Sequence, residues 1–162
     1  MVIIPVTIAA IFFLLFLLFN SLKFAALIIT VLPFASIGGI IGLAVTGEFL
    51  SVPASVGFIV LWGIATLNGV VLVTYIRKLR DEGMAVAEAV REGALARFRP
   101  VMMTATVAML GLIPFLFATS PGSEVQRPLA IVVIGGLITC TVLTLIVVPT
   151  LYRFFEEERI EA

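Results

Sequence analysis

Long apolar stretches separated by short polar connections dominate the chain. Each apolar stretch comes close to the roughly 20 residues that a helix needs to cross a bilayer. Five stretches fit this description, and they lie at residues 2–19, 24–46, 54–76, 101–118 and 128–152. The pattern predicts an all-α, polytopic membrane protein. Residues 1–155 would form one bundle of five transmembrane helices, and residues 156–162 a charged cytoplasmic tail.

The third and fourth stretches are joined by a longer connection, which predicts one further element. Apolar residues recur in it at helical spacing, at Val86, Ala89, Val90, Ala94 and Phe98. Charged residues of both signs take the other faces, which favours a solvated connector over a lipid-binding or calmodulin-binding segment. We expect a short amphipathic helix near residues 82–97 that lies on the cytoplasmic surface.

The composition supports a membrane protein and excludes several other classes. Apolar residues make up 62% of the chain, above the roughly 45–50% of a soluble domain. The formal net charge is zero, so nothing indicates a nucleic-acid partner. The chain has no histidine and a single cysteine, Cys140. We therefore predict no disulfide framework, no metal site and no cofactor.

The distribution of lysine and arginine predicts how the helices cross the membrane. With five spans, the first connection, the third connection and the C-terminal tail share one side. That side holds nine basic residues: Lys23, Arg77, Lys78, Arg80, Arg91, Arg97, Arg99, Arg153 and Arg159. The opposite side holds only Arg127. Because basic residues concentrate on the cytoplasmic side, we expect the N-terminus outside and the C-terminus in the cytoplasm.

Small residues predict where the helices pack closely. Gly38 and Gly42 are four residues apart in the second span, and Gly135 and Gly136 lie in the fifth. Small side chains let helix backbones approach each other in a membrane. These four glycines are candidate helix-packing positions, and they would serve either a transport bundle or a small membrane scaffold that binds partner helices.

Few side chains inside the predicted spans can carry chemistry. No aspartate or glutamate falls within the five spans, and the chain has no Asp pair, Ser–His dyad or zinc motif for intramembrane proteolysis. The missing motifs argue against an intramembrane protease. The missing carboxylates leave only neutral polar side chains inside the spans, although proton or cation transport usually needs an ionisable group at membrane depth. Threonines in membrane helices often bond to their own backbone, but the amide of Asn68 needs a partner outside its helix. A hydrogen bond between helices and a place in a proton relay are both open for Asn68.

Four long segments resemble one known family. They are "LPFASIGGIIGLAVTG", "LSVPASVGFIVLWGIATLNGVVLVTYI", "EAVREGALARFRPVMMTATVAMLGLIPF" and "GSEVQRPLAIVVIGGLITCTVLTLIVVPTLY". In this order they are similar to the last five transmembrane helices of resistance–nodulation–division efflux pumps. "EVQRPLA", "VIGGL" and "LNGVVLV" resemble the heavy-metal division of that superfamily, and within it the cobalt–zinc–cadmium type.

The resemblance implies a secondary active transporter, a proton-driven cation antiporter of the bacterial inner membrane. Members of the family have twelve spans and two large periplasmic insertions, and they form trimers with a periplasmic adaptor and an outer-membrane channel. The chain would correspond to the C-terminal transmembrane part and would need the remaining transmembrane half as a partner. We therefore expect the chain to transport nothing by itself.

The resemblance also assigns candidate proton-relay residues. Asn68, Arg97 and Thr104 match relay positions of the multidrug branch, whose essential carboxylate lies on a span that this sequence does not contain. Leu67 stands where that branch has a relay lysine, and Val101 stands where copper and silver members carry a lysine. Because of Leu67 the multidrug relay cannot be assumed, and Val101 counts against a copper-type relay. A membrane scaffold or a multidrug member of the superfamily are the alternatives.

Overall fold

The computed structural model describes residues 2–161, with side chains described for residues 2–155. The described chain contains helices and no strands. The helices are α1 (Ile3–Phe19), α2 (Leu22–Thr46), α3 (Val52–Asp81), α4 (Val86–Leu116) and α5 (Ser123–Glu161). The prediction of an all-helical fold is confirmed. The predicted tail continues the backbone of α5 as far as Glu161, and its side chains lie outside the described residues.

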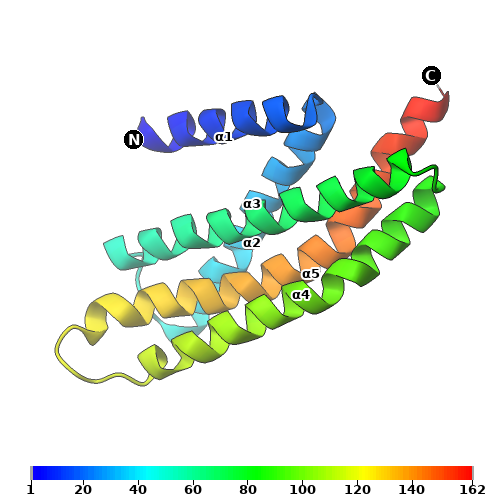
Figure 1. The fold of residues 1–162 in the computed structure, drawn as a ribbon. Helices are drawn as coiled ribbons and strands as arrows, with labels where there is room; N and C mark the ends of the chain where they lie inside the picture. The colour runs from blue at the N-terminus through cyan, green and yellow to red at the C-terminus, as the bar shows by residue number, and fades with distance from the viewer. Residues whose placement is uncertain (1, 162) are drawn as a thin grey trace.

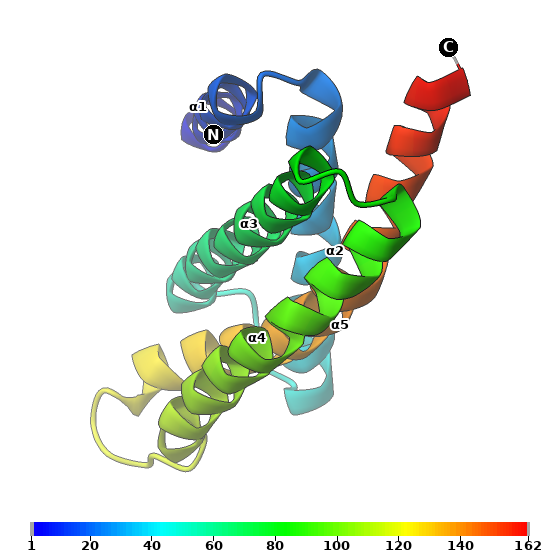
Figure 2. The ribbon, with the colours of Figure 1, turned by 45° about the vertical axis from the view of Figure 1, so that its right-hand side comes forward.

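Helix α5 lies at the centre of the bundle, because α2, α3 and α4 all pack against it. Figure 1 shows α3 and α4 as a long antiparallel pair that runs beside α5, while α2 crosses these helices at a steeper angle. Helix α1 lies at the edge of the bundle and packs mainly against α2. The turned view in Figure 2 shows α1 standing apart from α3, α4 and α5.

The crossing of α2 over α5 depends on glycine. A Cβ atom added at Gly38 would collide with the carbonyl oxygen of Gly135 and with the hydroxyl of Thr139. A Cβ atom added at Gly135 would lie 2.5 Å from the carbonyl oxygen of Gly38. At Gly42 the approach is less close, because an added Cβ atom would lie 3.1 Å from the carbonyl oxygen of Ile131. At this crossing the two backbones are in direct contact, as small residues permit in membrane helices.

Two further glycines admit large apolar side chains from neighbouring helices. A Cβ atom at Gly136 would collide with the side chain of Leu61, which is fully buried on α3. A Cβ atom at Gly93 would lie 2.5 Å from a γ-carbon of Ile76. Gly136 therefore sets the spacing of α3 and α5, and Gly93 sets that of α3 and α4.

Four helices are long and apolar enough to cross a membrane: α2, α3, α4 and residues Ser123–Phe155 of α5. Helix α1 is apolar but has only 17 residues. At 1.5 Å per residue it is about 25 Å long, slightly less than a hydrocarbon core of about 30 Å. The structure thus supports a multi-pass membrane protein, with four of the five predicted spans meeting the length requirement.

The structure does not confirm the predicted division between a surface helix at 82–97 and a span beginning at residue 101. Both belong to α4, which continues from Val86 through Pro100 to Leu116. A proline removes one backbone donor and crowds the preceding turn, but helices in membranes tolerate it where packing holds both sides. Here buried residues continue along one face across the proline, from Gly93 to Val101.

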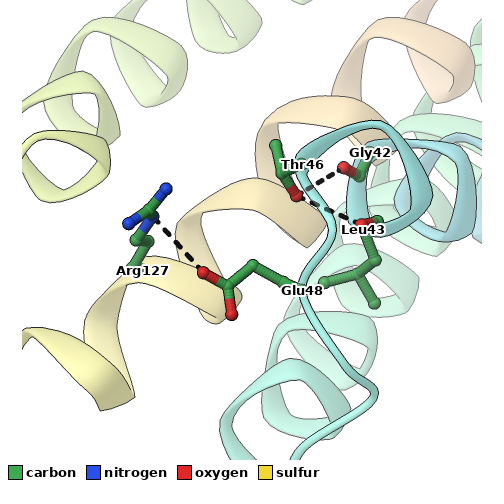
Figure 3. A network of polar contacts seen from close by, with 5 residues as sticks. All are labelled: Gly42, Leu43, Thr46, Glu48 and Arg127. Atoms are coloured by element: carbon green, nitrogen blue, oxygen red, sulfur yellow. Dashed lines mark hydrogen bonds and ion pairs between the residues drawn. The ribbon is translucent and has the colours of Figure 1, made fainter.

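The connection between α2 and α3 contains capping residues for both helices. Ser51 accepts a hydrogen bond from the backbone N–H of Ala54 at the start of α3, and Pro53 lies in the first turn. Helix α2 ends at Gly47, whose positive φ of 72° suits a residue without a Cβ atom. Just beyond it, Glu48 forms an ion pair of 3.4 Å with Arg127 on α5, which Figure 3 shows joining the α2–α3 connection to α5.

Candidate functional site

The three candidate relay residues lie together. Asn68 on α3 and Arg97 and Thr104 on α4 line one small cavity of about 150 Å³ between these two helices. The other lining residues are Leu67, Val71, Pro100 and Val101. Arg97 follows Asn68 by 29 residues and Thr104 follows it by 36. The three share one cavity because α3 and α4 pack together as antiparallel helices (Figure 1).

Asn68 offers a side-chain amide that no other described side chain uses. The residue is half-buried, and among residues 2–155 its amide has no hydrogen-bond partner. An amide with two donors and an acceptor is costly to leave unpaired at membrane depth. Asn68 is therefore available to a group from outside the described residues, and it does not join α3 to another helix of this bundle.

Arg97 lies over an aromatic ring. Its guanidinium carbon lies 5.2 Å from the centroid of the Tyr75 ring, and both residues are half-buried. Within residues 2–155 no carboxylate lies within ion-pair distance of Arg97. The sequence analysis missed Tyr75, although Tyr75 is seven residues from Asn68 and so lies on the same face of α3, two turns away.

Thr104 donates its hydroxyl to the backbone carbonyl of Pro100 at 2.9 Å. Thr74 and Thr106 bond to their own helices in the same way, at 2.7 Å each. This is the behaviour expected of threonine in membrane helices. The oxygen of Thr104 keeps its lone pairs, so it can still accept a hydrogen bond from a protonated group in the cavity.

A second polar cluster lies at the end of α1, and the sequence analysis missed it as well. Arg77 on α3 donates a hydrogen bond of 2.8 Å to the carbonyl oxygen of Phe19. The same guanidinium lies 5.7 Å from the Phe19 ring centroid and 5.5 Å from that of Phe24. The Phe24 ring stacks on Tyr152 of α5, with centroids 5.0 Å apart. This Arg77 cluster joins α1, α2, α3 and α5 at one point.

The part of the chain that the structure describes contains no group of three or more His, Cys, Asp or Glu residues that could hold a metal ion. The candidate site therefore consists of one cation, one amide, one hydroxyl and one aromatic ring. Such a set can stabilise and orient a carboxylate, but it cannot act as one.

Comparisons with known proteins identify the family of the chain. A family model described as the AcrB/AcrD/AcrF family matches residues 1–156. The cobalt-zinc-cadmium resistance protein CzcA of Cupriavidus metallidurans is 53% identical over 152 residues, which cover 94% of this chain and 14% of that protein. The nickel and cobalt resistance protein CnrA of the same organism is 49% identical over 150 residues, covering 93% of this chain and 14% of that protein.

A solved structure supports the same relationship. The X-ray structure of a heavy metal efflux pump matches with a TM-score of 0.86 and 47% sequence identity, and the match covers 96% of this chain and 16% of that chain. The chain spans about one seventh of the length of the curated relatives that it matches. With a family model over nearly all of its length, the chain belongs to the AcrB/AcrD/AcrF family of resistance–nodulation–division efflux transporters.

Proposed function

We propose that the chain forms part of a heavy-metal cation efflux transporter driven by proton antiport. One observation carries the proposal: Asn68, Arg97 and Thr104 converge on one cavity, and Arg97 has no carboxylate partner among the described residues. The relatives named for cobalt, zinc, cadmium and nickel resistance support a divalent metal cation as the substrate.

The cavity suits a carboxylate that is alternately ionised and protonated. Arg97 would favour the ionised form, because an opposite charge nearby stabilises it. Protonation would remove the attraction to Arg97, and the neutral carboxyl group could then turn toward Asn68 and Thr104. Each protonation state would hold α3 and α4 differently against the helix that carries the carboxylate. Such a change in packing is how proton uptake would move distant parts of the transporter.

The carboxylate must come from outside the described residues, which makes the chain one half of a site. We propose that it completes the site with a further set of transmembrane helices. The membrane orientation in this proposal follows the basic residues, with α1 as a fifth span, a periplasmic N-terminus and a cytoplasmic C-terminus. As in other members of the family, a homotrimer with a periplasmic adaptor and an outer-membrane channel would complete the export path.

A chimera tests the proposal. The 152 residues of CzcA that align with this chain are replaced by the corresponding residues of this chain, and zinc and cobalt resistance are measured in a metal-sensitive host. We expect the chimera to confer resistance and Arg97→Gln to abolish it at an equal membrane level. Full resistance with Arg97→Gln would contradict a relay at this cavity.

The isolated chain provides the complementary test. Reconstituted alone in liposomes with a pH gradient, it should move neither zinc nor cobalt, because no carboxylate of the described residues reaches the cavity. Metal flux that depends on the gradient would contradict this expectation. A chimera that inserts normally but confers no resistance would favour the alternative of a membrane scaffold.

A further inference from the structure

The side chain of Arg97 on α4 contacts α3 at two places, the cavity beside Asn68 and the ring of Tyr75. It lines the cavity with Asn68, and its guanidinium lies over the ring of Tyr75. Asn68 and Tyr75 are seven residues apart on α3, which corresponds to about 10 Å along the helix axis. A single arginine side chain thus bridges the cavity and the ring.

The ring supplies an electrostatic partner to a cation that has no anionic partner among residues 2–155. The face of an aromatic ring is negative, and a guanidinium within about 6 Å of the centroid is attracted to it. The distance of 5.2 Å meets this condition. Because both residues are half-buried, the attraction is less screened than on an exposed surface.

We propose that Tyr75 is a positioning residue for Arg97. Its ring holds the guanidinium at the cavity whenever the carboxylate of the relay is protonated and exerts no attraction. Without the ring, the long arginine side chain would turn toward the cytoplasmic interface, as cationic side chains near helix ends do. The inference rests on the proposed relay, and it adds the residue that keeps the relay cation in place through both of its states.

A packing role for Tyr75 must be separated from a role for its ring. Tyr75 also packs against the buried core of the bundle, so a loss of function in one variant would not distinguish the two. Phenylalanine and tryptophan keep an aromatic face, whereas leucine fills space without one. Rescue by aromatic residues alone is therefore the signature of the positioning role.

The first measurement uses the chain itself in detergent micelles. The side-chain N–H resonance of Arg97 is observed by nuclear magnetic resonance in the unmodified chain and in Tyr75→Phe, Tyr75→Trp and Tyr75→Leu. We expect a ring-current shift in the three aromatic forms and its loss in Tyr75→Leu. The same resonance position in all four forms would overturn the contact.

The second measurement uses the chimera and compares the metal transport rate at equal membrane levels. Tyr75→Leu should lower the rate about 2- to 5-fold, the range expected for a partly exposed cation–π contact. Tyr75→Phe and Tyr75→Trp should retain it. A loss in Tyr75→Phe as large as that in Tyr75→Leu would assign the role to the hydroxyl and overturn the inference.

Arg97→Gln in the chimera distinguishes a failure of the proposed relay from a failure of the proposed role of Tyr75. If Arg97→Gln abolishes transport and Tyr75→Leu leaves the rate unchanged, the relay stands and the role of Tyr75 is overturned. If Arg97→Gln leaves transport unchanged, the proposed relay is overturned and the role of Tyr75 with it.

Discussion

A guanidinium N–H of Arg77 on α3 donates to the carbonyl oxygen of Phe19, the last residue of α1, over 2.8 Å. That carbonyl is one of the four at a helix C-terminus that lack a partner within the helix. Because α1 packs mainly against α2, this bond is a direct link from the edge helix to α3. A positive charge at a helix C-terminus is also favourable for the helix dipole.

We therefore predict that Arg77→Gln destabilises the bundle by about 2 kcal/mol, since a charge-assisted hydrogen bond contributes about 1.5–3 kcal/mol. Equilibrium unfolding in mixed micelles measures the change. Lys78→Gln is the matched control, because Lys78 is exposed on the same turn of α3. Equal stability of the two variants would mean that the Arg77 cluster does not hold α1.

The glycine crossing of α2 and α5 predicts a strong steric effect. Gly38→Ala places a methyl group against the backbone of Gly135, and overpacking of this kind costs about 1–3 kcal/mol. Gly111→Ala is the control, because nothing lies within 4 Å of its added Cβ atom and alanine favours a helix. In the same unfolding assay, the stability of Gly38→Ala should be well below that of Gly111→Ala. Similar stabilities would show that α2 and α5 can move apart freely at this crossing.

Asn68→Leu should affect stability and transport differently. Because the amide has no partner among the described residues, the substitution should change the stability of the isolated chain by less than about 0.5 kcal/mol. In the chimera it should lower metal resistance while membrane insertion stays normal. Thr74→Val serves as the control, since Thr74 bonds only to its own helix in the described structure. Unchanged resistance would remove Asn68 from the relay.

The ion pair of Arg127 with Glu48 should contribute little. The two side chains are 48% and 31% exposed, respectively, and exposed pairs contribute about 0–1 kcal/mol. Arg127→Gln should therefore lower stability by less than about 1 kcal/mol, and the loss should shrink further in high salt. A loss as large as that of Arg77→Gln would show that the α2–α3 connection is held to α5 mainly by this charge pair.

The sequence was sufficient for the apolar spans and for part of the site, but not for the continuity of α4 through Pro100. Apolar stretches predict α1, α2, α3, α5 and the C-terminal part of α4, and the resemblance predicts Asn68, Arg97 and Thr104 as relay residues. Tyr75 and Arg77 were missed because their roles depend on partners in distant segments. The contact of Tyr75 with Arg97 depends on the register of α3 against α4. The partner of Arg77 is a backbone carbonyl, which every residue carries, so the sequence cannot indicate it.

The continuity of α4 through Pro100 has a mechanical consequence for the cavity. Proline has no N–H, so the hydrogen bond from position 100 to the carbonyl of Ala96 is missing, and the backbone ladder is interrupted in the turn that contains Arg97. This turn, at the Arg97 end of the two turns that separate Arg97 from Thr104, is therefore easier to bend than a turn that keeps all its hydrogen bonds. A small bend there would change the distance between the cation and the hydroxyl while α3, with Asn68 and Tyr75, stays in place.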